Sequence, residues 1–381
     1  MKTRAAILWG QGQDWSVEEI ELDPPKTGEV LIKLVGSGLC HSDEHLRTGD
    51  LTVPADVAQA LSIHQYPVIG GHEGAGEVVE VGPGVTSVKP GDHVALSFMP
   101  ACGKCPSCNS GRTNLCDVGA FLGLGMQPTD FTARHHSGAG QDLQISCFLG
   151  TFGEYTVASE MSVIKIDDDI PLEKAAVVGC GVTTGWGSAV YAAGVKAGDT
   201  AVIVGTGGIG MNAVQGAAMM GAENVIAVET VDWKREKARE FGATHTAASI
   251  EEAVQLVGEI TRGRLADKVV ISVGVADADL IAPAMSMTAK GGRVVHTAVA
   301  PLAQTEVKLD LTELTFWQRE LVGTVFGSAN PRYDIPRLLA LYKAGKLKLD
   351  ELVTNEYKLD DINRGYDDMY NGTNIRGFLR Y

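Results

Sequence analysis

The feature that most constrains the fold is a glycine turn between a short apolar run and a segment without proline. Ala201–Val204 is apolar, and Gly205–Gly210 follows it at once. In this spacing Gly205 permits a tight turn, Gly207 lets a ligand approach the backbone, and Gly210 allows a helix to pack closely on a strand. The N-terminus of that helix would favour a phosphate group. We therefore predict a strand, turn and helix that bind a dinucleotide. The turn residues expected to contact it are Gly205, Gly207, Gly208, Ile209 and Gly210.

An acidic residue stands where such a site would meet a ribose. A second apolar segment, Asn224–Val228, ends at Glu229, 19 residues after Gly210. A carboxylate there can accept hydrogen bonds from ribose hydroxyls and would repel a 2′-phosphate, which predicts NAD rather than NADP. A solvated strand end is the simpler alternative for Glu229.

The pattern of predicted secondary structure changes near residue 182. A chain of 381 residues is long for one core, so we expect two domains. Before residue 182, short β-type runs alternate with Gly and Pro, which indicates an irregular, mostly β domain. After it, apolar strands alternate with helical segments, as in a doubly wound parallel sheet. The predicted division is residues 182–324 for a Rossmann domain, inserted between residues 1–181 and 325–381 of a second domain.

The charge balance excludes some partners. The chain has 32 basic and 47 acidic residues, a net charge of −15, which argues against nucleic acid or an anionic membrane as partner. The apolar run at the N-terminus is too short for a signal peptide. The uncharged stretch Thr200–Ala222 is interrupted by six glycines, so we interpret it as strand, turn and helix instead of a membrane span. A cytoplasmic enzyme is the expectation.

Four cysteines lie close together in one loop. They follow the spacing C-x2-C-x2-C-x7-C, and four thiolates can close a tetrahedral shell around Zn²⁺ with no position open for chemistry. Disulfides or an iron–sulfur cluster are the alternatives. Without a secretion signal, close cysteine spacing favours metal over disulfides. We predict a structural zinc site at Cys102, Cys105, Cys108 and Cys116.

Three other segments carry candidate metal ligands beside glycines, namely 38–45, 70–76 and 179–181. Two thiolates and one imidazole would leave a fourth position open, as a catalytic zinc requires. The candidates are Cys40, His72 and Cys180. Taken singly, Cys180 could be a packed core thiol and His72 a hydrogen-bonded buried histidine. Cys147 has no assignment, and a buried free thiol is the expectation.

Taken together, these motifs resemble the zinc-containing medium-chain alcohol dehydrogenase family over essentially the whole chain. The runs Gly-His-Glu-Gly-Ala-Gly, Gly-Cys-Gly-Val-Thr-Thr-Gly and Gly-Thr-Gly-Gly-Ile-Gly, with the four-cysteine loop, stand in the family's order. The resemblance implies a GroES-like catalytic domain, a Rossmann domain and two Zn²⁺ ions per chain. It makes Cys40, His72 and Cys180 the catalytic zinc ligands, with Glu73 behind the metal and Asp43 orienting His72.

The same resemblance implies roles for further residues. Ser42 and His45 match a proton relay, and His41 matches a contact to the coenzyme pyrophosphate. Lys234 matches a residue near the adenosine ribose, and Arg376 a phosphate-binding arginine. The remaining positions are Phe98 and Thr184 in the substrate pocket, and Ala298 and Val299 beside the nicotinamide.

Within the family, the runs Leu-Cys-His-Ser-Asp-Glu-His and Phe-Gly-Ser-Ala-Asn-Pro resemble the NDMA-dependent, or nicotinoprotein, alcohol dehydrogenases. That resemblance implies NAD(H) held as a tightly bound group and recycled by an external redox acceptor, small alcohol and aldehyde substrates, and a homodimer or homotetramer. The segment Thr52–Tyr66 is longer than is usual in the family, which leaves the shape of the pocket and the size of the substrate open.

Other functions stay open at this point. A conventional enzyme with exchangeable NAD is one alternative, and a thiol-dependent formaldehyde dehydrogenase is another. The latter class has a basic residue after the fourth loop cysteine, whereas this chain has Asp117–Ala120. A non-catalytic relative would be expected to lose zinc ligands or relay residues, and none is missing.

Overall fold

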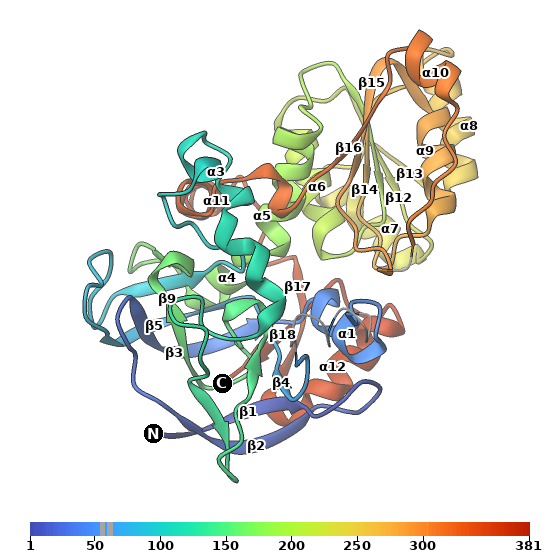
Figure 1. Cartoon of the computed structure of the whole chain (residues 1–381). Coiled ribbons are helices and arrows are strands. Elements are labelled where there is room, and N and C mark those ends of the chain that lie inside the picture. Colours follow the sequence, from blue (N-terminus) through green and yellow to red (C-terminus); the bar gives the residue numbers. More distant parts are fainter. Residues whose placement is uncertain (54–57, 59–63, 303) are drawn as a thin grey trace. The chain divides into compact units, whose positions relative to one another are not determined.

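The computed structural model describes residues 1–53, 58, 64–302 and 304–381 (Figure 1). The chain divides into two compact units. The first contains Met1–Cys180 and Asn330–Tyr381, and the second contains Gly181–Ala329. Gly181 and residues 325–329, which the sequence analysis grouped with the catalytic domain, cluster with the second unit. Most of Thr52–Tyr66 lies outside the described residues.

The first unit is built on two sheets of short strands. One has the order β7-β2-β1-β4-β8. Its strands are β1 (Lys2–Leu8), β2 (Ser16–Leu22), β4 (Val68–Ile69), β7 (His135–Ser137) and β8 (Gln144–Ile145). Antiparallel pairing of β1 with β2 and β4 buries Ala6 and Leu8 in a core with Trp15 and Phe152.

The other sheet has the order β10-β6-β5-β3-β18-β17, and β9 also pairs with β3. Its strands are β3 (Glu29–Gly38), β5 (Gly74–Val81), β6 (His93–Leu96), β9 (Tyr155–Ser159), β10 (Val163–Lys165), β17 (Val353–Lys358) and β18 (Arg376–Arg380). The C-terminal strands thus complete a sheet begun near the N-terminus. The helices of this unit are α1 (His41–Thr48), α3 (Pro106–Asn109), α4 (Leu172–Ala176), α11 (Pro331–Lys343) and α12 (Ile362–Tyr370).

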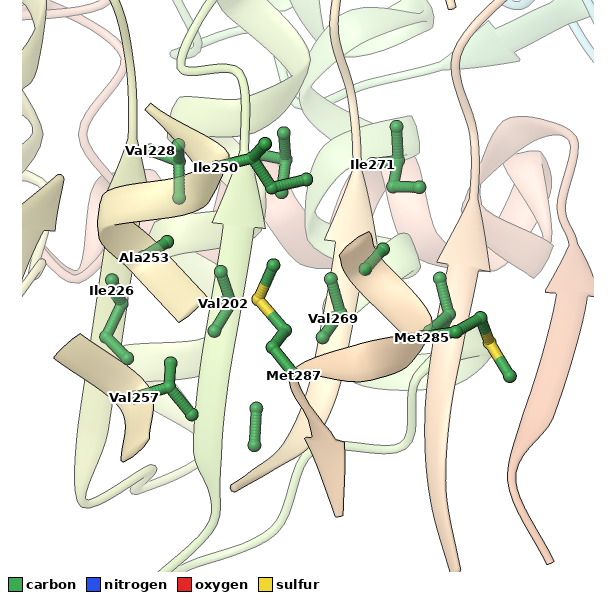
Figure 2. Packing of buried hydrophobic residues seen from close by; sticks show 14 of the residues in the cluster. Val202, Ile226, Val228, Ile250, Ala253, Val257, Val269, Ile271, Met285 and Met287 are labelled. Carbon is green, nitrogen blue, oxygen red and sulfur yellow. The ribbon is translucent and has the colours of Figure 1, made fainter. Parts of the chain in front are cut away.

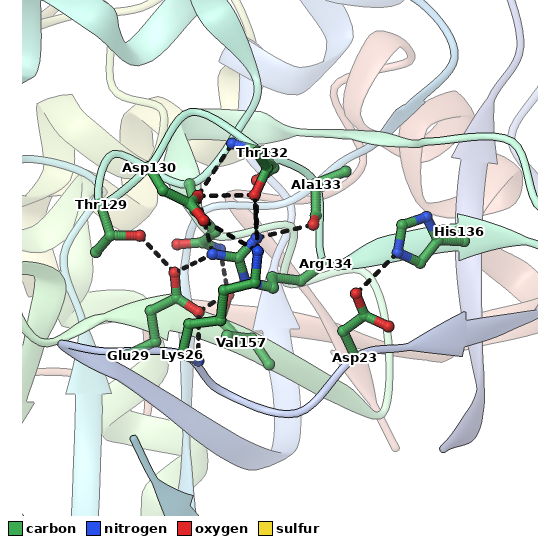
Figure 3. A network of polar contacts seen from close by, with 11 residues as sticks. Asp23, Lys26, Glu29, Thr129, Asp130, Thr132, Ala133, Arg134, His136 and Val157 are labelled. Atoms are coloured by element: carbon green, nitrogen blue, oxygen red, sulfur yellow. Dashed lines mark hydrogen bonds and ion pairs between the residues drawn. The ribbon is translucent and has the colours of Figure 1, made fainter. Parts of the chain in front are cut away.

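A buried ion pair holds one part of this unit together (Figure 3). Arg134 and Glu29 have fully buried side chains, and Nε of Arg134 donates to Oε2 of Glu29 at 2.8 Å while Nη2 donates to Oε1 at 2.6 Å. Nη2 also donates to Oδ1 of Asp130 at 2.9 Å, and the backbone N–H of Lys26 donates to Glu29. The network joins the start of β3 to the loop before β7, because its members come from both segments.

The second unit is a six-stranded, wholly parallel sheet of order β13-β12-β11-β14-β15-β16. Its strands are β11 (Thr200–Val204), β12 (Asn224–Val228), β13 (His245–Ala247), β14 (Ala266–Ile271), β15 (Thr288–His296) and β16 (Glu320–Gly323). In chain order this is 3-2-1-4-5-6, the strand order of a dinucleotide-binding sheet. The predicted combination of an irregular, mostly β domain with a doubly wound parallel sheet is confirmed.

Helices cover both faces of this sheet (Figure 1). They are α6 (Gly208–Met219), α7 (Asp232–Glu240), α8 (Ile250–Ile260), α9 (Ile281–Ser286) and α10 (Leu311–Phe316), whereas α5 (Gly181–Gly187) packs on α6. Figure 2 shows Ile250, Ala253 and Val257 of α8 packed on strand residues that include Val202 and Val269. The strands are apolar on this face because α8 and α9 bury it, and α6 packs on the sheet from the opposite face. In the part of the chain that the structure describes, no helix is long and apolar enough to span a bilayer.

Candidate zinc centre and dinucleotide site

Four buried side chains of the first unit converge on one point. Cys40 precedes α1, His72 and Glu73 precede β5, and Cys180 ends the first segment of the unit. One ligand atom from each lies within 4.8 Å of the other three, and all four residues are buried. Two thiols, an imidazole and a carboxylate are a donor set that suits Zn²⁺. The structure thus brings Cys40, His72 and Cys180 together, as the sequence predicted, with Glu73 beside them.

The two thiols of this cluster influence each other. A hydrogen bond with Cys180 holds the pKa of Cys40 well below its usual range, and Arg376 and His72 lower it further against the effect of burial. The same hydrogen bond, with burial, raises the pKa of Cys180. The two sulfur atoms are therefore close enough to interact directly within the cluster.

His72 is oriented by a buried carboxylate. Its Nδ1 lies 3.0 Å from Oδ2 of Asp43, whose side chain has no exposed surface. The other oxygen, Oδ1, accepts from the backbone N–H of Gly71 at 2.8 Å and from the hydroxyl of Ser146 at 2.9 Å. With Nδ1 paired to Asp43, Nε2 is directed to the cluster. Ser146 was absent from the sequence analysis because it lies 103 residues from Asp43 and matches no motif.

Arg376 contacts Glu73 instead of lying in the open. Arg376 is the first residue of β18, and its side chain is buried. Its Nε donates to Oε2 of Glu73 at 3.1 Å, and its Nη2 donates to Oε1. The resemblance assigned Arg376 to a coenzyme phosphate, and that role stays a prediction. The structure adds that the arginine and the carboxylate behind the cluster form a buried pair.

Ser42 and His45, the residues predicted to form a proton relay, lie on α1. Sγ of Cys40 is 3.7 Å from Oγ of Ser42, so Ser42 borders the cluster. The His45 ring is buried beside the ring of His41, with 6.0 Å between their centres, and its Nδ1 lies 3.1 Å from Oδ2 of Asp50. Asp50 is partly exposed, and hydrogen bonds from Thr48 and His45 lower its pKa. Sequence reasoning did not single out Asp50.

Of the predicted pocket residues, Phe98 lies beside the cluster. Its ring meets the His72 ring edge to face, with centres 5.8 Å apart. Thr184 belongs to α5 in the second unit, where it is buried. Cys147 is a free thiol, but its side chain is partly exposed rather than fully buried as expected, and its backbone is left-handed at φ 52°.

The four-cysteine loop forms a second cluster in the first unit. The sulfur atoms of its four cysteines lie within 4.8 Å of one another, and none of them is in a disulfide. Backbone N–H groups of Lys104 and Cys105 donate to Sγ of Cys102, each at 3.4 Å. Burial raises the pKa of Cys102, but these hydrogen bonds outweigh it and bring it to about 7. Four sulfurs with backbone donors suit a closed Zn²⁺ site.

The glycine turn of the second unit has the shape a dinucleotide needs. Gly205 has a φ of +87°, which favours glycine, and a Cβ on Gly210 would lie 1.8 Å from the carbonyl oxygen of Gly205. By contrast, a Cβ on Gly207 would meet nothing within 4 Å. That open space is where a pyrophosphate would approach the N-terminus of α6, so these residues fit the coenzyme.

Glu229 ends β12 next to this turn. Its Oε2 accepts from the backbone N–H of Thr206 at 3.0 Å and from the hydroxyl at 3.1 Å. Lys234 on α7 is half-buried, and burial lowers its pKa against the attraction of Glu229. The guanidinium of Arg235 donates to the backbone oxygen of Glu229 at 2.6 Å. An acid and two cations therefore surround the predicted ribose position.

Ala298 and Val299 follow β15 on the same sheet. Ala298 packs against the core, and the carbonyl of Val299 accepts from the N–H of Ala276 at 2.8 Å. These contacts place a loop at the carboxyl end of the strands, the edge at which such sheets bind ligands. Their role beside the nicotinamide stays a prediction.

Two protein-family models match the chain, one in its N-terminal part and one in its C-terminal part. Residues 26–168 match the family described as alcohol dehydrogenase GroES-like domain, and residues 208–344 match zinc-binding dehydrogenase. The chain is 52% identical to NDMA-dependent alcohol dehydrogenase of Amycolatopsis methanolica and 51% identical to alcohol dehydrogenase B of Mycobacterium tuberculosis. Each of these alignments covers 100% of this chain and 99% of the relative.

A solved structure agrees as well. The alcohol dehydrogenase zinc-binding domain protein of Burkholderia ambifaria has a TM-score of 0.91 at 31% identity, over 100% of this chain and 99% of that chain. The chain belongs to the zinc-containing medium-chain alcohol dehydrogenase family.

Proposed function

We propose that this protein oxidises small alcohols to aldehydes, and catalyses the reverse reaction, by hydride transfer with NAD at the cluster of Cys40, His72 and Cys180. The observation that carries the proposal is the buried convergence of these ligand atoms with Glu73 within 4.8 Å. A site of three protein ligands with space for substrate is the catalytic form of a zinc centre, whereas the four-cysteine cluster is the closed, structural form. We therefore assign two Zn²⁺ ions per chain.

The bound groups supply the chemistry that side chains cannot: zinc lowers the pKa of an alcohol hydroxyl, and the nicotinamide accepts hydride. The chain's own residues orient the substrate and move the proton. Asp43 fixes the ring of His72, and Phe98 covers one side of the cluster with an apolar face. Ser42 Oγ would accept the alcohol proton as it gives up its own hydroxyl proton toward His45, which passes a proton on. Because the His45 ring is buried and its Nδ1 faces Asp50, the partly exposed Asp50 lies on the way to solvent.

Paired cysteine variants test the assignment of the two metal sites. Cys40→Ser removes a catalytic ligand, so we expect loss of alcohol oxidation and of one zinc per chain, with thermal stability largely kept. Cys102→Ser removes a structural ligand, so we expect loss of the other zinc and a lower melting temperature. Metal analysis, melting curves and oxidation of a primary alcohol are measured on both. Full activity of zinc-free Cys40→Ser protein would contradict the proposal.

We also propose that NAD(H) stays bound through turnover and is recycled by an external acceptor. The support is the 52% identity to a relative named for its dependence on NDMA. The test is the nicotinamide content after exhaustive dialysis, released by denaturation. About one NAD(H) per chain, with oxidation that needs an artificial acceptor, is expected. A protein that dialyses free of nucleotide and turns over only with added NAD would be a conventional alcohol dehydrogenase.

Finally, we propose a homodimer or homotetramer assembled through the second unit. β16 pairs with β15 and ends the sheet, and apolar side chains before it are exposed, among them Leu311 at 70% and Phe316 at 80%. An open strand edge and an apolar patch both favour association. Light scattering should give at least two chains per particle, and Phe316→Glu should weaken the assembly. A monomeric wild-type protein would contradict this proposal.

A further inference from the structure

One residue of the glycine turn has a contact that the glycine spacing does not explain. Thr206 stands at a position that the pattern leaves unspecified, yet its side chain has no exposed surface. Its hydroxyl donates to Oε2 of Glu229 at 3.1 Å, and its backbone N–H donates to the same oxygen at 3.0 Å. The turn after β11 is therefore joined to the end of β12 by a side chain as well as by the backbone.

The carboxylate of Glu229 is held from two directions. Opposite Thr206, its Oε1 accepts from the backbone N–H of Val231 at 3.0 Å. The hydroxyl of Thr230 also donates to Oε1, at 3.4 Å. A carboxylate offers about four acceptor positions, and this longest contact, from an exposed residue, is the one that an incoming hydroxyl would replace. Glu229 is partly exposed, which lets that partner come from outside the chain.

We propose that Thr206 is a positioning residue for the coenzyme: its hydroxyl fixes the Glu229 carboxylate in the orientation that accepts the adenosine ribose 2′-hydroxyl. This inference rests on the proposed role of Glu229 in binding NAD. A free glutamate side chain would lose rotational freedom when it binds a ribose, which weakens binding. The hydrogen bond from Thr206 restricts the Glu229 side chain before the coenzyme binds, so less rotational freedom is lost on binding.

The hydroxyl can be removed with little other change. Thr206→Val keeps the side-chain volume and the backbone N–H that donates to Glu229, and deletes only the O–H donor. Thr206→Ser keeps the donor and deletes a methyl group. Hydrogen bonds to a charged acceptor are about twice as strong as neutral ones. We expect Thr206→Val to weaken NAD binding about tenfold, and Thr206→Ser to bind as the wild-type protein does.

An NAD analogue that lacks only the adenosine 2′-hydroxyl separates this role from a general effect of the substitution on the turn. Dissociation constants of NAD and of its 2′-deoxyadenosine analogue are measured by competition against radiolabelled NAD. NAD(H) that remains bound to the purified protein then exchanges with the radiolabelled NAD and is included in the measurement. The tenfold loss in Thr206→Val should appear with NAD and shrink to about twofold or less with the deoxy analogue. In a Glu229→Ala background, Thr206→Val should add no further loss, because the two residues act through one contact.

Equal losses for NAD and the deoxy analogue would overturn the inference, since the substitution would then disturb the turn and not the ribose contact. Unchanged NAD binding in Thr206→Val would overturn it as well, and so would a Thr206→Ser protein as weak as Thr206→Val. A wild-type protein that does not bind NAD would instead refute the proposed function, so the two failures are distinguishable.

Discussion

Removal of the buried arginine should show how much the first unit depends on one ion pair. Arg134→Met keeps a long apolar side chain and deletes the guanidinium that donates twice to Glu29 (Figure 3). The carboxylate then stays buried with the backbone N–H of Lys26 and the hydroxyl of Thr129 as its remaining donors. Loss of one partner of a buried pair typically costs about 3–5 kcal/mol.

The size of the effect in a melting experiment follows from the size of the unit. For a domain of this length, 1 kcal/mol corresponds to roughly 2–4 °C, so the melting temperature should fall by about 6–20 °C. The control is Lys26→Met, because Lys26 is half-exposed and its ion pair with Asp130 should contribute about 1 kcal/mol or less. Adding Glu29→Gln to Arg134→Met should restore part of the loss, because no unpaired charge is then buried.

Calorimetry and chemical denaturation measure these differences. If Arg134→Met is no more destabilising than Lys26→Met, the buried pair does not support the unit, and the reasoning from burial is wrong.

Three further predictions concern the sites and the pH dependence. Burial lowers the pKa of His135 to about 3, so the unfolded chain binds a proton below about pH 6.5 and the folded chain does not. Stability is therefore complete above that pH and falls by about 2 kcal/mol on going to about pH 5; His135→Gln should flatten this slope in denaturation curves. Glu229→Ala removes the acid but leaves Lys234 and Arg235, so the preference for NAD over NADP should fall at least about tenfold in binding assays. Ser146→Ala removes a donor to Asp43, so a chelator should strip the catalytic-site zinc about tenfold faster.

Each of these has a contrary result. An unchanged pH slope in His135→Gln would mean that another group controls acid stability. An unaltered preference in Glu229→Ala would remove Glu229 from the ribose site. Zinc retention in Ser146→Ala equal to that of the wild-type protein would show that Gly71 holds Asp43 alone.

The parallel sheet could be predicted because its signals are local. The expected segment Ala201–Val204 lies within β11 and the expected segment Asn224–Val228 is β12, since apolar runs beside glycine turns predict buried parallel strands. The helix expected after the glycine turn begins within it and occupies Gly208–Met219. One helix was missed although its signal is present: at the start of α8 the N-cap hydroxyl of Ser249 accepts from the N–H of Glu252, and the Glu252 carboxylate accepts from the N–H of Ala248, an arrangement close to a capping box.

The strands of the first unit were harder to predict from the sequence, because they form by pairing between segments far apart in the chain. β4 and β8 have two residues each, too few for a periodicity, and they exist because β4 pairs with both β1 and β8. The candidate metal ligands, with Asp43 and Glu73 beside them, could be predicted from motifs, whereas two further residues of the site could not. Asp50 and Ser146 carry no spacing rule, and only the folded chain brings them to His45 and Asp43.

X-ray absorption at the zinc edge, on the purified protein and on Cys40→Ser, tests the account most directly. Two zinc ions, one with four sulfur ligands and one with two sulfurs, a nitrogen and an oxygen, give about three sulfurs per zinc on average. Cys40→Ser should lose the mixed site and alcohol oxidation together, and the remaining zinc should show about four sulfurs. A wild-type protein with one zinc bound by four sulfurs that still oxidises alcohols would contradict the account, because catalysis would not need the cluster of Cys40, His72 and Cys180.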